Sequence, residues 1–234
     1  MRRGSVLFIA TSHERMGVLR SRKTGIWLED FALPCEILSE AGFHVASASP
    51  LGGDIPVDPD SLRRPMDAAF DPEEHLARNR ELLSESIPLN EVREEDYDAV
   101  FYPGGYGSYW DLSVDRANAG LLEAFIRNGK PVAAVRQGSA AFLAAKTPSG
   151  ASIMNGRRVT GASDDEERML ALDRVVPFSL GQRLANCGAD YSCAAPWEPH
   201  VIRDGMLVTG QNPQSSGELA MAMVHILDGS PGNA

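Results

Sequence analysis

The stretch GKPVAAVRQGSAAF, residues 129–142, decides the fold. Its apolar run at 131–135 predicts a buried strand, and a helix of small residues is predicted to follow over 139–146. Between them lie Arg136, Gln137 and Gly138, which predict a sharp strand-to-helix turn of the kind called a nucleophile elbow. Such a turn holds its first residue above a sheet at a helix N-terminus, where an anion is stabilised. The alternative is an ordinary turn with a solvated arginine.

Strand and helix patterns alternate on both sides of this unit. Short apolar runs and a hairpin signal at Asp204-Gly205 predict strands over 5–10, 43–47, 98–102, 157–161 and 200–209. Helices are predicted over 26–41, 71–84, 117–128, 164–172 and 215–227. The alternation indicates an α/β fold with a mostly parallel sheet and helices on both faces. Ligands of such sheets bind beyond the carboxyl ends of the strands.

Length and composition favour one globular domain. The chain has 234 residues, of which 43% are hydrophobic and 23% are charged. This size fits a single core. We therefore predict one domain over 1–234, with an insertion around 50–95 that covers one edge of the sheet.

The net charge and the cysteine content limit the classes of binding partner and the cellular compartment that we expect. A net charge of −10 disfavours nucleic acid, and no apolar stretch approaches the ~20 residues that a membrane span needs. Cys35, Cys187 and Cys193 are odd in number and lack a C-x-x-C spacing, and no secretory signal is visible, so we expect a cytoplasmic protein. The histidines are dispersed, which predicts no metal site. A small molecule is the expected partner, and no cofactor is expected.

A second glycine-rich loop follows the strand predicted over 98–102. It reads PGGYG at 103–107. Its backbone N–H groups can form an oxyanion cradle facing the elbow, so Gly104, Gly105 and Gly138 are the predicted cradle residues. The loop is not a phosphate loop, because no Gly-Lys-Ser/Thr follows. By itself it is also compatible with a simple tight turn.

Four motifs occur in order along the chain: KTGIWLEDF at 23–31, YDAVFYPGG at 97–105, GKPVAAV at 129–135 and VTGQNP at 208–213. Together they resemble the ThiJ/PfpI superfamily, especially its glyoxalase III-like and chaperone-like branch. The resemblance covers nearly the whole chain. It implies a flavodoxin-like three-layer sandwich related to the class I glutamine amidotransferase fold, and a homodimer.

The chain departs from this family at the elbow. The family's elbow reads Cys-His-Gly, with an acidic residue, usually Glu, from the first helix beside the cysteine. The matching positions here are Arg136, Gln137 and Asp30, and the family's glycine-loop histidine corresponds to Tyr106. An arginine is always protonated and cannot attack a carbonyl, so cysteine-based chemistry loses its nucleophile. Neither Cys35 nor Cys193 is expected to replace it.

The residues present at the elbow suggest another chemistry. Arg136 can bind a carboxylate, enolate or phenolate oxygen through paired donors. Asp30 can act as a general base or acid, and Gln137 can orient a water or a substrate carbonyl. In the opposing interpretation, Asp30 and Arg136 form a salt bridge that fills an inactive site.

Aromatic and polar residues on loops are predicted to form the pocket walls. The predicted substrate-binding residues are Tyr106, Tyr109, Trp110, Trp197, Glu198 and His200. Core packing or a dimer contact is the alternative for the two tryptophans. Glu166 and Glu167 lie in an acidic run and are interpreted as a solvated helix start.

Three functions remain open from the sequence. The leading hypothesis is a cysteine-free enzyme, of lyase, hydratase or isomerase type, that performs cofactor-independent acid–base chemistry on a carbonyl compound, in specialised metabolism. The second is a pseudo-enzyme that acts as a binding or chaperone-like homodimer. The third is a weak glyoxalase III-like activity, with Asp30 acting on a bound water.

Overall fold

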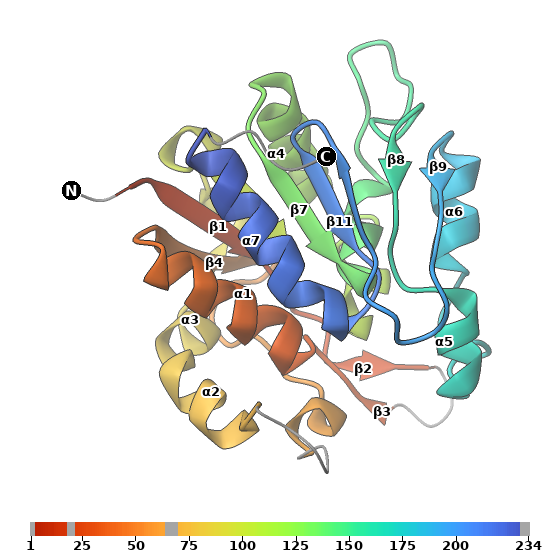
Figure 1. Ribbon diagram of the computed structural model, residues 1–234, viewed down its shortest axis with the longest axis horizontal. Coiled ribbons are helices and arrows are strands. Elements are labelled where there is room, and N and C mark those ends of the chain that lie inside the picture. Colours follow the sequence, from red (N-terminus) through yellow and green to blue (C-terminus); the bar gives the residue numbers. More distant parts are fainter. Residues whose placement is uncertain (1–2, 18–21, 64–69, 230–234) are drawn as a thin grey trace.

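The computed structural model describes residues 3–17, 22–63 and 70–229, which form a sandwich around one main sheet (Figure 1). Its seven strands lie in the order β10–β11–β7–β6–β1–β4–β5. The bounds are β1 Ser5–Ile9, β4 His44–Ser49, β5 Ile87–Pro88, β6 Ala99–Tyr102, β7 Val132–Val135, β10 Val201–Asp204 and β11 Leu207–Gly210. Neighbouring strands are parallel except for the β10–β11 hairpin. The predicted fold class is confirmed.

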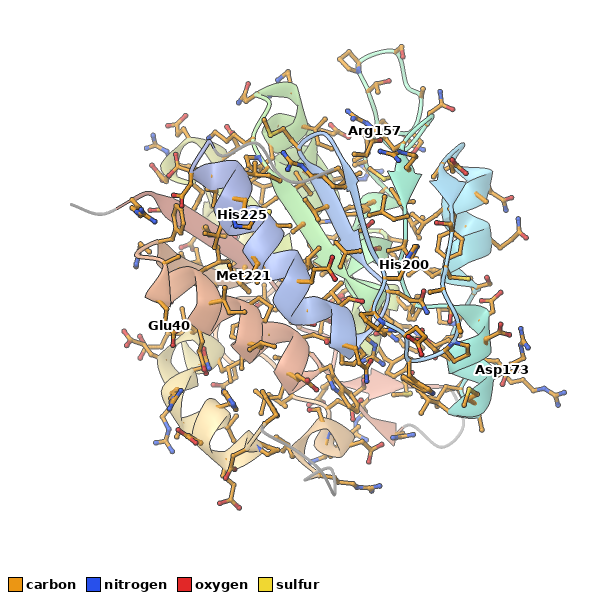
Figure 2. The ribbon with its side chains drawn as sticks, in the orientation of Figure 1. Glu40, Arg157, Asp173, His200, Met221 and His225 are labelled. Carbon is orange, nitrogen blue, oxygen red and sulfur yellow. The ribbon has the colours of Figure 1, made fainter. Side chains whose placement is uncertain are left out.

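Helices cover both faces of the sheet. On one face α1 (Leu28–Glu40) and α7 (Ser216–Leu227) lie side by side, and α4 (Arg116–Arg127) covers the other face (Figure 1). Side chains of β1 alternate between the two cores: Phe8 packs under α1 and α7, whereas Leu7 belongs to the core beneath α4. Strands buried on both faces read as continuous apolar runs, which is why this strand is visible in the sequence. The outer side of α7 carries Met221 and His225 (Figure 2).

Smaller elements frame the carboxyl ends and edges of the sheet. The short helices are α2 Pro72–Arg78, α3 Arg80–Ser84, α5 Asp164–Met169 and α6 Leu180–Asn186. Two small sheets pair β2 Arg15–Met16 with β3 Arg22–Lys23, and β8 Arg158–Val159 with β9 Asp190–Tyr191. The 3-10 helices are η1 Pro59–Leu62, η2 Leu89–Glu91, η3 Glu94–Asp96, η4 Tyr106–Tyr109, η5 Arg136–Phe142 and η6 Pro213–Ser215. Within the described residues, no helix combines the length and apolar character needed to span a bilayer.

Three predicted segments differ from the structure. Residues 139–146 do not form an α-helix: the chain winds as the 3-10 helix η5, which begins at Arg136 without a side-chain cap. Residues 71–84 form two helices that meet at Asn79, whose side chain donates to the carbonyl oxygen of His75 and so competes with helix continuation. The strand predicted at 157–161 is shorter and pairs with β9 outside the main sheet.

The segment predicted as an insertion contains β5, the strand at one edge of the main sheet. β5 pairs with Ala48 and Ser49 of β4, and α2 and α3 precede it along the chain. Residues 64–69 of the predicted 50–95 insertion lie outside the described residues. The single-domain assignment stays a prediction.

Candidate active site

The elbow places Arg136 directly after β7 in a left-handed backbone conformation, with φ of 52°. Residues other than glycine seldom adopt this conformation, and where they do the surrounding structure enforces it. Gly138 allows the close approach of this turn to the end of β6, since a Cβ there would overlap the carbonyl groups of Tyr102 and Pro103. The predicted strand-to-helix turn is therefore present. The alternative of a solvated arginine is wrong, because Arg136 is only 4% exposed.

Asp30 is the ionic partner of Arg136. Their closest atoms, Asp30 Oδ2 and Arg136 Nη1, lie 3.3 Å apart, and Asp30 is fully buried. The other carboxylate oxygen accepts a hydrogen bond of 2.9 Å from the Ser216 hydroxyl at the start of α7. Gly104 leaves the space for this carboxylate, because a Cβ at that position would overlap it. Residues 106 positions apart in the chain thus form one buried pair.

Two aromatic rings enclose the guanidinium. Its central carbon lies 5.0 Å from the centre of the Trp27 ring and 5.9 Å from that of Tyr106. Cation–π contacts of this kind favour the charged form of arginine. Trp27 is half-buried, and its backbone N–H donates to the carbonyl oxygen of Gly104 at 2.8 Å, which joins the start of α1 to the glycine loop. Sequence reasoning did not select Trp27, although it stands inside the KTGIWLEDF motif.

A second carboxylate joins the site through Gln137. The Gln137 amide nitrogen donates to Glu167 at 2.9 Å, and the Tyr106 hydroxyl donates to the other oxygen of Glu167 at 2.8 Å. Glu167 and Glu166 are each 4% exposed, so their interpretation as a solvated helix start is wrong. The physical reason is the capping box of α5, in which Ser163 and Glu166 bond to each other, so that Glu166 and Glu167 point inward while Asp164 and Asp165 stay exposed. That Ser-x-x-Glu spacing was the available sequence signal.

Glu166 organises the loop that carries Trp197. Its Oε1 accepts hydrogen bonds from the Trp197 backbone N–H at 3.0 Å, from the Gln211 side chain at 3.1 Å and from the Asn212 side chain at 3.0 Å. These donors, together with the Ser163 hydroxyl, offset the effect of burial and lower the pKa of Glu166. The VTGQNP motif therefore anchors this loop through its amide side chains.

Two buried carboxyl groups, those of Asp30 and Glu167, have raised pKa values and lie near the permanently charged Arg136. Burial raises the pKa of Asp30 above its ordinary value, and Arg136 and Ser216 only partly oppose the shift. Burial also raises the pKa of Glu167, opposed by Gln137 and Arg136. Burial lowers the pKa of Arg136, but Asp30, Tyr106 and Glu167 together raise it by more, so the guanidinium stays protonated. A carboxyl group of raised pKa beside a permanent cation can move a proton while an anionic oxygen is stabilised.

The predicted backbone cradle is partly occupied. The Gly105 N–H donates to the side-chain oxygen of Gln137 at 3.3 Å. The Gly104 N–H has no hydrogen-bond partner among the described residues. Gly104 therefore supplies the amide that remains available next to the ion pair, and Gly105 instead fixes the orientation of Gln137.

The structure brings some predicted wall residues to the elbow and leaves others apart. Tyr106 contacts the guanidinium, and buried Tyr109 stacks on Tyr106. Trp110 stacks on His13 instead, and Trp197 lies on the Glu166 loop with φ of 66°.

The remaining two wall candidates face other groups. Glu198 is exposed, and His200 lies 3.3 Å from the Ser192 hydroxyl. Cys35 is a residue of α1 and points into the core, and Cys193 is exposed. Among the described residues, no group of three or more His, Cys, Asp or Glu is arranged to hold a metal ion.

The ion pair is closed off from solvent in this conformation. Arg136 and Asp30 are almost completely buried, while Trp27 above them keeps partial contact with solvent. A ligand that reaches the pair must therefore displace side chains such as Trp27.

An α/β sandwich with a sharp elbow facing a double-glycine loop defines the class of the protein. The model of the DJ-1/PfpI family matches residues 23–226, and the chain belongs to that family. It is 27% identical over 230 residues to a putative glutathione-independent glyoxalase, hsp3105, of Schizosaccharomyces pombe, covering 94% of this chain and 90% of the relative. It is 28% identical over 228 residues to glyoxalase 3 of Candida albicans, covering 92% and 94%.

A solved structure supports the same placement. The Rapid Encystment Protein of 24 kDa from Francisella tularensis superimposes with a TM-score of 0.89 at 32% identity, covering 96% of this chain and 99% of the other.

Proposed function

We propose that this DJ-1/PfpI protein is a cofactor-independent enzyme that converts a small 2-oxoaldehyde into a 2-hydroxy acid by acid–base chemistry, without a covalent enzyme adduct. The observation that carries the proposal is the Arg136 guanidinium, held 3.3 Å from the buried Asp30 carboxylate on a strained elbow. Strained backbone that the surrounding structure enforces is typical of functional sites, and this supports an active role for the elbow. The sequence resemblance implies that Arg136 stands at the position of the family's cysteine, and this supports a non-covalent reaction.

The relatives support the substrate class. Several are named glutathione-independent glyoxalases, and a glyoxalase acts on 2-oxoaldehydes. This favours a small, uncharged dicarbonyl such as methylglyoxal over the wider range of carbonyl compounds that the sequence left open. The charges around the site also favour an uncharged substrate. Asp30 already neutralises Arg136, and Glu167 adds a second carboxyl group nearby. An uncharged substrate is therefore easier to accommodate than an anionic one.

The reaction balances without an oxidant. Water adds to the aldehyde carbon and gives a geminal diol. Asp30 removes the proton from that carbon, a carbon–carbon double bond forms, and the electron pair of the ketone C=O bond moves onto its oxygen, which gives an enetriolate. Arg136 and the Gly104 N–H stabilise this negative charge. The proton returns to the former ketone carbon, and one hydroxyl proton of the diol carbon moves to the former ketone oxygen. The product is the 2-hydroxy acid, so the net change is the addition of one water.

Gln137, Tyr106 and Glu167 have a positioning role in this scheme. Glu167 accepts hydrogen bonds from Gln137 and Tyr106, which fixes the amide beside the elbow and the phenol beside the guanidinium. Gln137 then presents its remaining hydrogen-bonding capacity to the attacking water.

The test is a turnover assay with methylglyoxal, in which NMR detects lactate. We expect Asp30→Asn to lower kcat by about 10²- to 10⁴-fold, the range of a lost general base, and Arg136→Gln to lower it by about 10²-fold or more. Glu218→Gln is the matched control, because it removes an exposed carboxylate from α7 near Ser216. Circular dichroism and thermal melting check that each variant folds.

Two outcomes would contradict the proposal. Turnover that is unchanged in both folded variants removes Asp30 and Arg136 from the mechanism. A folded wild-type protein that produces no 2-hydroxy acid from any of a panel of 2-oxoaldehydes removes the activity itself.

A second candidate is a non-catalytic binding or chaperone-like homodimer. The observation that favours it is that the site is closed to solvent, since Arg136 and Asp30 are 4% and 0% exposed. It predicts suppression of aggregation that survives mutation of both residues, together with no turnover. The homodimer stays a prediction that sedimentation velocity can decide.

A further inference from the structure

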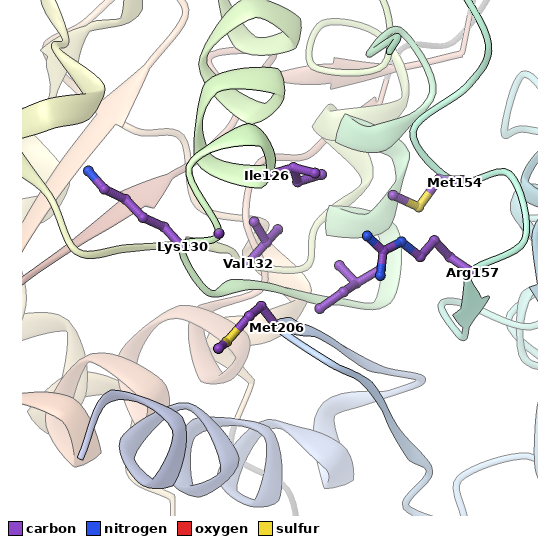
Figure 3. Close-up of a pocket in the computed structure, with 8 residues that line it drawn as sticks. Ile126, Lys130, Val132, Met154, Arg157 and Met206 are labelled. Carbon is purple, nitrogen blue, oxygen red and sulfur yellow. The ribbon is translucent and has the colours of Figure 1, made fainter. Parts of the chain in front are cut away.

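A cavity of about 140 Å³ lies at the opposite end of the sheet from the elbow (Figure 3). Val132 and Leu207, the first residues of β7 and β11, form part of its wall, together with Ile126 at the end of α4. Met154 and Met206 supply two flexible apolar side chains. The wall is thus mainly hydrocarbon and thioether, as in pockets that bind apolar ligands.

The charged residues that line this cavity are both basic, in a chain with a net charge of −10. Lys130 is already engaged: its ammonium group donates to the carbonyl oxygens of Glu94 and Tyr97 at 2.9 and 2.7 Å and pairs with the Glu94 carboxylate at 2.7 Å. It therefore has little capacity left for a ligand.

Arg157 is the basic residue of the cavity wall that still has hydrogen-bond donors available for a ligand. Its nearest carboxylate, Asp204, lies 3.9 Å away, and its guanidinium makes no hydrogen bond to the described residues. Asp204 uses its other oxygen to accept the backbone N–H of Arg158 at 3.0 Å. Figure 3 shows the Arg157 side chain reaching back toward Val132 across the cavity. A guanidinium with unused paired donors over an apolar floor matches the two ends of an apolar carboxylate.

We propose that this cavity binds a small monocarboxylate whose apolar body is about the size of a benzene ring, with the carboxylate on Arg157. Size supports this class, because a dry cavity of roughly 150 Å³ holds one benzene ring. The site is separate from the elbow: β7 joins Val132 to Val135, and three steps along a strand span about 10 Å.

The test follows benzoate binding by the methyl resonances of methionine in ¹³C-methionine-labelled protein. We expect benzoate to shift the Met154 and Met206 methyl signals, whereas acetate and lactate, which lack the apolar body, leave them unchanged. Met206→Leu assigns one of the two signals. Arg157→Leu should weaken benzoate binding about tenfold or more, in line with the loss of a charged hydrogen bond, and should leave benzyl alcohol binding within about twofold.

Two controls keep this outcome specific. Arg116→Leu removes an exposed arginine at the start of α4 and should leave benzoate affinity unchanged. Met206→Trp fills the rim of the cavity from the β10–β11 turn, where residue 206 is 48% exposed, and should abolish binding of both ligands without unfolding the protein.

The proposal is overturned if benzoate at millimolar concentration moves neither methionine signal. It is also overturned if benzyl alcohol binds the wild type as tightly as benzoate does, or if folded Arg157→Leu binds benzoate as the wild type does. These readouts measure binding alone, so they do not depend on activity at the elbow.

Discussion

Arg136 carries a permanent charge into a part of the molecule where Asp30 is its partner and where only 4% of the arginine is exposed to solvent. Taking two charges out of water is costly, and only good geometry offsets the cost. Here the Ser216 hydroxyl and two aromatic rings supply further interactions. The intact pair therefore adds little to the free energy of unfolding. Removing one partner nevertheless lowers that free energy strongly, because the other charge stays buried without a counter-ion.

Arg136→Leu should destabilise the protein by about 3 kcal/mol at neutral pH, because it leaves the Asp30 carboxylate buried without a cation. The loss should shrink as pH falls. Burial raises the folded-state pKa of Asp30 above its ordinary value of 3.8, so the folded state binds the proton more tightly than the unfolded state. The contribution of Asp30 to the free energy of unfolding is then largest below about pH 3.8, and it is lost as pH rises through the raised pKa. Urea denaturation at a series of pH values measures this slope.

The double variant Asp30→Asn with Arg136→Leu is the matched control for that experiment. It contains neither charge, so it should recover much of the lost stability and lose the added pH dependence. Equal stability of the single and double variants at neutral pH would show that the Asp30 carboxylate is not held in a dry environment.

At the scale of elements, the site depends on how closely η5 approaches the loop after β6. Gly138 permits that approach, since a Cβ there would meet the carbonyl groups of Tyr102 and Pro103, which cannot rotate away. The same loop continues into Gly104, which borders Asp30. A change at one glycine therefore shifts the elbow and the ion pair together.

Gly138→Ala should cost about 3 kcal/mol of stability, the upper range for an added methyl group in a packed site. Gly120→Ala is the control, because Gly120 lies within α4 and a Cβ there meets nothing within 4 Å. That variant should gain about 0.5 to 1 kcal/mol, the difference in helix propensity between alanine and glycine. Calorimetry of both variants compares them, and similar melting temperatures would contradict the tight-approach argument.

At the scale of the whole molecule, two cores share one sheet. Neighbouring residues of β1, such as Leu7 and Phe8, point into opposite cores, so loss of either helical layer exposes the same strands to water. The β4–β5 pairing ties the segment after residue 50 to this sheet as well.

We therefore predict that the chain unfolds in one cooperative transition, as a single domain. Near-ultraviolet and far-ultraviolet circular dichroism should give coincident denaturation curves, and calorimetric and van't Hoff enthalpies should agree. A separate early transition that leaves the sheet intact would instead identify the 50–95 region as an independent unit.

The fold was readable because its signals are local. Residues 5–9 and 132–135 are short apolar runs, and the turn at 136–138 has a fixed spacing. The Asp204-Gly205 hairpin is another such signal, and the β10–β11 pairing confirms it. The 3-10 winding of η5 was not readable, because small residues suit an α-helix equally well and the winding depends on what packs against them.

By itself, the sequence determined the alternation of strands and helices, the elbow at Arg136 and the glycine loop that faces it. These features depend on residues within a few positions of each other. Only the tertiary structure decided that Glu167 is buried against Gln137, that Trp27 covers the guanidinium and that Arg157 overlooks an apolar cavity. Those facts depend on which distant segments meet: Asp30 bonds to residues 106 and 186 positions away, and no local pattern encodes such distances.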